Sequence, residues 1–464
     1  MLFLRMVKMR LDLNNDARAK RHAMMFGGLL TVFLSVVLMQ QVRAEVLGVA
    51  DAIELMHENN DELSQKKSQF YADEEQVVQA WARLKPDLSV SAARGTAEYD
   101  TTSLAGQDAS YTRVRLSLVQ PIYSQGRFKA VSRSEKFVAS SKAGLVLDYQ
   151  AKTLETLTAY FELLRFKEVA SLVQQEFVDN ELKVLRIEKM LKRGLATKMD
   201  QLEAQSRYDE LRSATVQSQN DVTVSLKRLE RLVGRTVLNV EPVNVNLWQR
   251  AKILLEQGEW HDLAQKKSLI IRLAELRYEV ATQDVNVEQA GHWPELTLRA
   301  GLNNNTDSYT TNIEEERTLE LELKVPLYSG GGISSRVTAA QHLLKSSEFD
   351  VRDQKKFVKV KLDELLSKLS ASVASIQALK LSVASNEAYQ AAAEKGMSHG
   401  LRGLFDVLEA KARVYRAQRT LSEQVYANIT DQFELLYLMG ELTPEMIRLY
   451  LKPNYDVSSI FVAP

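Results

Sequence analysis

Two carboxylates near the end of the chain have a spacing that could do chemistry. Asp406 and Glu409 are three positions apart, so a helix would carry both on one face. An earlier stretch of the chain carries a matching acid, Asp200. Lining a narrow bore, such carboxylates would act on passing ions. On an isolated exposed helix they are an ordinary solvated surface.

The sequence lacks the motifs of catalysis and of cofactor or metal binding. It has no cysteine, which excludes thiol chemistry, disulfides and lipid attachment through cysteine. Its six histidines are scattered, without an HExxH motif. The stretch 329–332 (SGGG) lacks the Lys and Ser/Thr of a phosphate-binding loop, and no GxSxG motif occurs. We therefore predict no enzyme, no cofactor and no metal site.

The overall charge of the chain is balanced. There are 60 Lys and Arg residues against 60 Asp and Glu residues, a formal net charge of zero. Nucleic-acid binding requires a concentrated basic surface. We therefore expect no nucleic-acid partner.

Residues 1–44 have the pattern of a secretory signal peptide. The basic region, apolar run and small-residue cleavage site are Arg18, Lys20 and Arg21, then Met24 to Met39, then Val42-Arg43-Ala44. The apolar run is shorter than the ~20 residues of a spanning helix, which favours a cleaved signal over a retained anchor. No later stretch is long and apolar enough to span a membrane as a helix. Insertion of the exported chain would therefore use strands.

The remaining chain is an internal repeat. Residues 194–234 align with residues 400–440 without a gap, and Gly194 and Gly400 begin the two copies. Each glycine can end a long helix and let the chain reverse. The first repeat, 45–240, is predicted to hold a leading helix, strands 87–99 and 111–120, a long helix 126–193 and a return helix 195–233. The second, 259–440, follows a linker 241–258 and is predicted to hold strands 295–305 and 317–325, a long helix 332–399 and a return helix 401–439, before a tail 441–464.

The strands alternate in polarity with the period of two expected for a sheet with one apolar face. The apolar positions are Val114, Leu116 and Leu118 in the first half and Leu319, Leu321, Leu323 and Val325 in the second. Between them stand Arg113, Arg115 and Ser117, and Glu320, Glu322 and Lys324. We predict that the first set faces lipid and the second faces a lumen. Similar corners lead from strand to helix, with Pro121 and Gly126 matching Pro326 and Gly331.

Four strands cannot close a barrel, and an open sheet with unpaired edges cannot remain in lipid. Several copies must therefore share one barrel. The leading and return helices together roughly equal the length of one long helix, so stacking them end to end would give each half a slab two helices wide. Several such slabs could form the wall of a tube.

In this order of elements the chain resembles the TolC-like outer-membrane efflux proteins. The stretches that carry the resemblance are residues 120–123 (QPIY), 325–331 (VPLYSGG), 400–402 (GLR) and 406–410 (DVLEA). The resemblance implies a mainly α fold with a small transmembrane β part and two structural repeats. It further implies a homotrimer whose twelve-stranded β-barrel, set in outer-membrane lipid, continues into a periplasmic α-helical barrel.

By motif position, the resemblance makes Asp406 and Glu409 the acidic ring of a periplasmic gate, with Glu409 replacing the more usual Asp. It makes Arg402 a basic link between hairpins and Asp200 its partner. The implied function is the passive exit duct of a tripartite efflux pump or type I secretion system. Its partners would be a periplasmic adaptor and an inner-membrane RND or ABC transporter of a Gram-negative bacterium. The alternative is a periplasmic coiled-coil adaptor or structural protein, which would carry one hairpin and not two equivalent ones.

Overall fold

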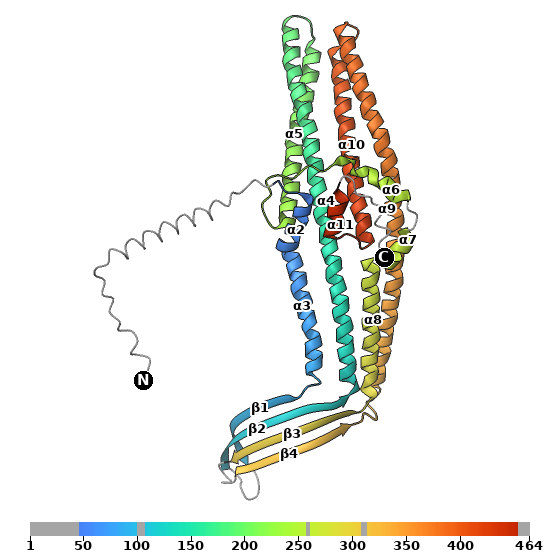
Figure 1. Ribbon diagram of the computed structural model, residues 1–464. Helices are drawn as coiled ribbons and strands as arrows, with labels where there is room; N and C mark the ends of the chain where they lie inside the picture. The colour runs from blue at the N-terminus through green and yellow to red at the C-terminus, as the bar shows by residue number, and fades with distance from the viewer. Residues whose placement is uncertain (1–45, 100–106, 257–259, 308–312, 453–464) are drawn as a thin grey trace, which may run out of the picture.

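The computed structural model describes residues 46–99, 107–256, 260–307 and 313–452. The predicted signal peptide 1–44 and the end of the predicted tail lie outside the described residues. The molecule is elongated, with a four-stranded sheet at one end and two helical hairpin tips at the other (Figure 1). Within the described part of the chain, none of the helices is apolar over enough length to cross a membrane.

Both halves of the chain contain leading helices, a pair of strands, a long helix and a return helix in that order, and the second half has additional short helices. The first half consists of α2 (Val49–Asn59), α3 (Asp61–Ala82), β1 (Asp87–Tyr99), β2 (Gln107–Ser124), α4 (Gln125–Lys192) and α5 (Lys198–Val233). The second consists of η1 (Val245–Gln249), α6 (Arg250–Glu256), α7 (Trp260–Lys267), α8 (Leu269–Gln289), η2 (Ala290–His292), β3 (Glu295–Asp307), β4 (Ile313–Lys324), α9 (Gly332–Ser398), α10 (Leu404–Leu438) and α11 (Pro444–Leu451).

Several boundaries differ from the expected ones. The return helices α5 and α10 begin three residues later than predicted, because the intervening residues form the turn and its cap. β2 and β4 begin earlier than the alternating stretches, because backbone pairing continues beyond the apolar side chains. The predicted linker 241–258 contains η1 and α6, and the predicted tail contains α11.

The return helices stack on the leading helices, as the matching of their lengths predicted (Figure 1). In the first half, Asn60 lies between α2 and α3, and its side chain accepts from the Leu63 N–H at 3.0 Å. The same amide donates to the Leu232 carbonyl at the end of α5, at 3.1 Å. In the second half, Lys267 at the end of α7 donates to Glu441, just beyond α10, at 2.7 Å. These contacts join the short helices into two columns beside α4 and α9.

The sheet joins the two halves edge to edge. Its order is β1-β2-β3-β4, and every neighbouring pair is antiparallel. The β2–β3 pair links strands from different repeats, while β1 and β4 form the two edges. The register places Leu116 opposite both Val90 and Leu302, and Arg115 opposite Ser91 and Asn303. Apolar and polar side chains therefore separate onto opposite faces.

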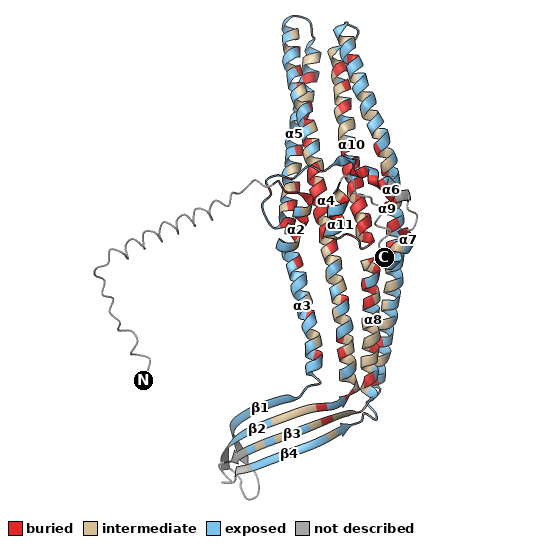
Figure 2. Ribbon diagram, viewed as in Figure 1, coloured by how far each residue is buried: buried red, intermediate tan, exposed pale blue. Residues whose placement is uncertain are grey.

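The hydrophobic core lies at the waist of the molecule, where the short helices surround α4 and α10 (Figure 2). The rings of Phe161 on α4 and Phe433 on α10 stack there with centroids 5.6 Å apart. The buried Tyr160 hydroxyl donates to the carbonyls of Leu47 and Glu241, at 2.8 Å each. The core thus fixes both halves and the segments that connect them, and it leaves the hairpin tips outside.

Candidate functional site

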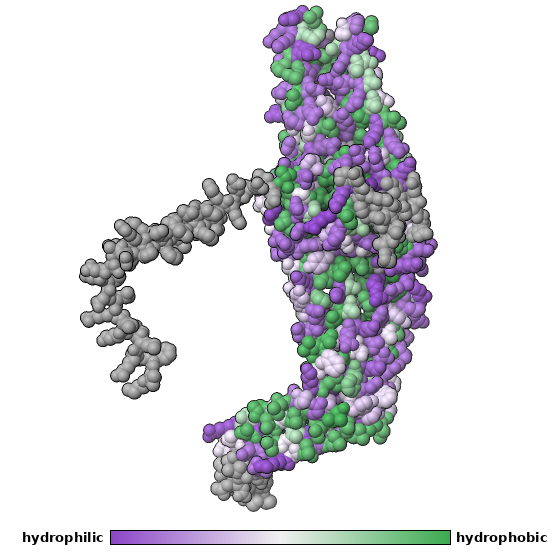
Figure 3. Space-filling model, viewed as in Figure 1, coloured by the Kyte–Doolittle hydropathy of each residue, from purple (hydrophilic) through white to green (hydrophobic). Residues whose placement is uncertain are grey.

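One face of the sheet is apolar and exposed. Leu319, Leu321 and Leu323 on β4 are 77%, 63% and 63% exposed, and Leu88 and Val90 on β1 are exposed too. The space-filling view shows this hydrophobic surface across the sheet (Figure 3). Water does not stabilise so much contiguous apolar surface, and such a face requires lipid or another protein.

The opposite face is polar. Ser89 and Ser117 form a hydrogen bond of 2.8 Å across β1 and β2. Arg299 on β3 forms an ion pair with Glu322 on β4, with 2.7 Å between Nε and Oε2. This face therefore offers small hydroxyls and paired charges, which suit an aqueous lumen.

The outer limit of the apolar face moves stepwise from strand to strand. The last apolar side chains on this face are Ala92 on β1, Val114 on β2, Leu302 on β3 and Leu319 on β4. In the register of the sheet, this limit retreats by two residues from β2 to β3 and again from β3 to β4. From β1 to β2 the limit does not move, because Ala92 pairs with Val114. Averaged over the three strand pairs, the offset of the limit corresponds to a strand tilt of about 40° against a flat boundary, which is within the range of transmembrane barrels.

Exposed aromatic side chains gather where the sheet meets the helices. They belong to Trp81, Tyr123, Trp293 and Tyr328. Tryptophan and tyrosine prefer the interface between lipid and water because their rings are amphipathic. The aromatic residues thus mark the inner boundary of the apolar band.

The hairpin tips turn at the two predicted glycines. Gly194 and Gly400 both have φ of +71°, a left-handed conformation that glycine adopts without steric cost. The Leu195 N–H returns to the Met190 carbonyl at 2.9 Å, and the Leu401 N–H to the Gly396 carbonyl at 2.8 Å. Both tips therefore close with the same glycine-terminated hydrogen-bond pattern.

The predicted gate aspartates cap the helices that follow these turns. Asp200 accepts from the Thr197 N–H at 2.7 Å, and Thr197 accepts from the Asp200 N–H at 3.1 Å. Asp406 accepts from the Gly403 N–H at 2.9 Å. The repetition of aspartate in both copies thus has a local cause, since each satisfies a backbone donor at a helix N-terminus.

The predicted gate charges pair with neighbours on their own hairpin. Arg402 lies 3.8 Å from Asp406, measured from Nη1 to Oδ1. Glu409 accepts from Arg413 at 3.1 Å. Within one protomer, the ion pair of Arg402 is therefore with Asp406 and not with the predicted partner Asp200. Asp406 and Glu409 share one helix and stand near the tip, but each carboxylate has a cation of its own.

The strand-to-helix corners differ in the two halves, although their sequences match. β2 continues directly into α4, with a register shift between Pro121 and Tyr123 that accommodates the missing proline N–H. Gly126 therefore lies inside the first turn of α4. Residues 325–331, which include Pro326, instead separate β4 from α9, and Gly331 there has φ of +77°. The matching sequences therefore adopt different backbone conformations at the two corners.

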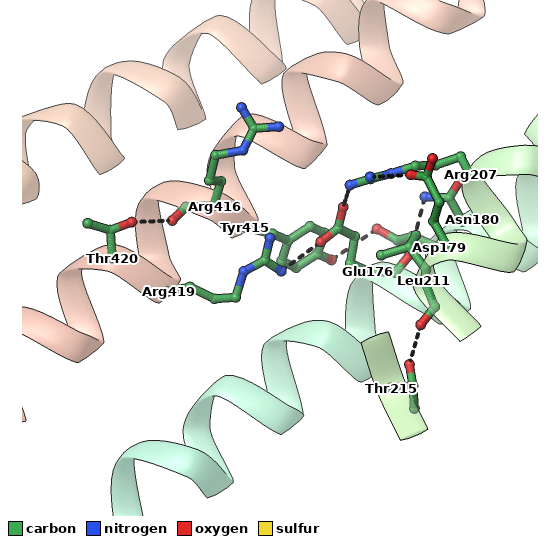
Figure 4. Close-up of polar contacts among 11 residues, drawn as sticks. Glu176, Asp179, Asn180, Arg207, Leu211, Thr215, Tyr415, Arg416, Arg419 and Thr420 are labelled. Carbon is green, nitrogen blue, oxygen red and sulfur yellow. Dashed lines mark hydrogen bonds and ion pairs between the residues drawn. The ribbon is translucent and has the colours of Figure 1, made fainter. Parts of the chain in front are cut away.

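A buried polar seam runs along α4, and it is not among the sites predicted from the sequence. Glu176, Asn180 and Lys183 are all buried, on the helix face that carries Phe161 and Val173 nearer the waist. Glu176 contacts arginines from α5 and from α10 (Figure 4). The signal was present in the sequence, because these polar residues continue the helical spacing of the apolar face. Only tertiary contacts show that they are buried.

A sequence model of the outer membrane efflux protein family matches residues 52–235 and 260–441. The chain belongs to this family. The match covers each half separately and so follows the internal repeat. The outer membrane efflux protein family consists of channel proteins, and membership decides against the alternative of a periplasmic adaptor.

Relatives and solved structures agree with this membership. The chain is 25% identical over 408 residues to outer membrane protein TolC of Escherichia coli (strain K12), covering 83% of this chain and 81% of the relative. It is 26% identical over 435 residues to the alkaline protease secretion protein AprF of Pseudomonas aeruginosa, covering 89% and 88%. The fold resembles the CmeC outer membrane channel of Campylobacter jejuni, with a TM-score of 0.73 at 13% identity over 89% of this chain and 90% of CmeC.

This member of the outer membrane efflux protein family is an outer-membrane exit duct of an efflux or type I secretion system. Its sheet is the membrane part, and its helices form a periplasmic extension. VceC of Vibrio cholerae shares the architecture, with a TM-score of 0.69 at 18% identity over 84% of this chain and 96% of VceC.

Proposed function

We propose that three copies of the chain form the working channel. The observation that carries this proposal is the open four-stranded sheet with one exposed apolar face and two edge strands, β1 and β4. Pairing β4 of each protomer with β1 of the next gives twelve strands and removes every edge. The Leu-rich faces then contact lipid, and the serines and paired charges line the lumen.

The hairpin tips form the periplasmic entrance of this channel. In the trimer, Asp406 and Glu409 from three protomers surround the bore and attract cations. Arg402 reaches Asp200 of a neighbouring protomer in the closed state, exchanging its weak 3.8 Å contact with Asp406 for an intersubunit pair. An exposed pair contributes only about 0–1 kcal/mol, but three act together on one entrance.

The channel conducts passively, and a partner supplies both the energy for transport and the cargo. A periplasmic adaptor and an inner-membrane RND or ABC transporter are its partners, as in tripartite assemblies. TolC and AprF belong to the relatives of the chain, and AprF is named for protease secretion. Drugs and polypeptides are therefore the two cargo classes to test.

Planar-bilayer recording of the purified full-length protein tests the channel function. The expected result is a trimer that inserts and conducts ions, with low conductance while the entrance is closed. Arg402→Ser and Asp200→Asn should both raise the conductance, and Asn at 200 still accepts the helix-capping hydrogen bond. Arg228→Gln is the matched control, because Arg228 pairs with Glu162 within one hairpin, far from the tip. A monomer that forms no pores would refute the proposal.

Deletion of the gene in its host identifies the cargo. Loss of small-molecule efflux should appear as increased susceptibility to several drugs, whereas loss of secretion should remove specific proteins from the culture supernatant. Complementation with the intact gene should restore the affected cargo. If the deletion strain shows neither increased drug susceptibility nor loss of secreted proteins, the role as an exit duct is contradicted.

A further inference from the structure

The seam between the two hairpins of one protomer changes character along its length. Near the waist, α4 contacts α10 through buried aromatic rings such as Phe161 and Phe433. Toward the tip, the contacts between α4 and α10 become polar. Arg165 approaches Glu423 at 3.9 Å, Glu176 binds Arg419, and Asp179 binds Lys411 and Tyr415. The tip half of this seam therefore depends on charge pairing.

Glu176 is the most buried charge of this seam. Only 2% of its side chain is exposed, and its two carboxylate oxygens accept from different elements. Oε1 accepts from Arg207 Nη2 on α5 at 2.7 Å, within the same hairpin. Oε2 accepts from Arg419 Nη1 on α10 at 2.7 Å, from the other hairpin (Figure 4). One carboxylate thus holds both hairpins at once.

The neighbouring groups reinforce this arrangement. Asp179, one helical turn further along α4, accepts from the Tyr415 hydroxyl at 3.0 Å and from Lys411 at 3.2 Å. Burial and the bond to Asp179 raise the pKa of Tyr415 to about 12, so the phenol remains a donor under physiological conditions. Burial opposes the charge of Arg207, but hydrogen bonds to Glu176 and Glu210 raise its pKa overall.

Arg207 and Arg419 have unequal effects on the buried Glu176, because only Arg207 belongs to the same hairpin. Removing the only partner of a buried charge is costly, because the charge is left without compensation. When α10 moves away from α4, Glu176 loses Arg419 but keeps Arg207, which belongs to its own hairpin. The contact across the hairpins can therefore break and re-form while the carboxylate remains paired.

We propose that Glu176, Arg207 and Arg419 form a reversible latch that holds the hairpins of one protomer together below the tip. Arg419 is the part that releases, and Arg207 is the part that keeps Glu176 paired during release. The apolar waist, centred on Phe161 and Phe433, stays assembled and acts as the pivot. The latch deepens the proposed gating function and rests on it. It lies inside each protomer, unlike the proposed contact of Arg402 with a neighbour.

The two arginines give opposite predictions. Arg419→Gln removes the bond between hairpins, so the entrance should open more often and the bilayer conductance should rise. Amide exchange at the start of α10 should become about tenfold faster, since a charge-assisted bond is lost. Arg207→Gln leaves the bond to Arg419 as the main charge compensation of Glu176. Conductance and α10 exchange should then stay at or below the wild-type level.

Controls separate a latch from a general loss of packing. Arg419→Lys should restore most of the closed state, and Arg228→Gln, within one hairpin, should change neither readout. Equal opening by Arg419→Gln and Arg207→Gln would overturn the latch, and so would an unchanged Arg419→Gln protein. Hydrogen exchange requires no ion flow. A wild-type protein without pores would therefore refute the channel function, while the exchange comparison would still decide the latch.

Discussion

Lys183 of α4 lies over the ring of Phe405 of α10, with 5.1 Å between Nζ and the ring centroid. The lysine is buried, and its neighbour Phe405 directly precedes the predicted gate residue Asp406. Burial is the main cause of the lowered pKa of Lys183. The nearby charges of Glu203 and Glu409 act to raise this pKa, whereas the charge of Arg207 acts to lower it. A partly desolvated cation thus joins the two hairpins beside the entrance.

The lowered pKa of Lys183 predicts how the tip responds to pH. Because the folded state binds this proton less tightly than the unfolded state, stability should rise with pH between the lowered value and 10.5, and fall as pH decreases through the lowered value. Lys183→Met should remove this contribution. Thermal unfolding at pH 7, 9 and 10 gives the melting temperatures of the wild type and of Lys183→Met. The melting temperature of the wild type, relative to that of Lys183→Met, should increase as the pH becomes alkaline. A difference in melting temperature that does not depend on pH would contradict a lowered pKa of Lys183 in the folded state.

The two faces of the sheet should respond oppositely to arginine. Leu116→Arg or Leu321→Arg should each cost about 2–4 kcal/mol near the bilayer midplane. Ser117→Arg and Thr318→Arg, on the polar face, should be tolerated. Glu322→Arg is a poor control, because it would place a second cation beside Arg299. The yield of folded trimer in outer-membrane fractions measures the effect, and equal yields would show that the faces are wrongly assigned.

The carboxylates of Asp406 and Glu409 should determine block by multivalent cations. In single-channel recordings, Asp406→Asn with Glu409→Gln should abolish block by a trivalent cation added on the periplasmic side. The resting conductance should change little, because Asn still accepts from the Gly403 N–H. Arg413→Gln should strengthen the block, because Glu409 would lose its own cation. Block that survives the double substitution would exclude both carboxylates from the binding site.

The tip glycines should be far less replaceable than the corner glycine of the first half. Gly194→Ala and Gly400→Ala force a side chain into φ of +71° and should each cost about 1–2 kcal/mol. Gly126→Ala meets open space in the first turn of α4 and should be neutral or stabilising. Limited proteolysis at the tips and denaturant unfolding measure the two effects. Equal sensitivity at all three positions would contradict this account.

The architecture of the chain follows from local patterns, so the sequence predicts it well. Alternation around Leu116 and Leu321 assigns the faces of the strands, because side chains of a strand point alternately to its two sides. The glycines at 194 and 400 identify the tips, because few other residues adopt their left-handed backbone. The repeated order of elements and the family motifs then identify the fold and the function.

The pairing of charges in the interior depended on the tertiary structure. Asp406 and Asp200 were predicted as gate residues, but each also caps the helix on which it lies, a role set by backbone geometry at the turn. Glu176 showed only as a charge on a long helix. Its burial depends on α5 and α10 meeting that face of α4, and these contacts join residues far apart in the chain. Helical spacing determines which residues share a face, whereas the packing of other helices decides whether that face is buried.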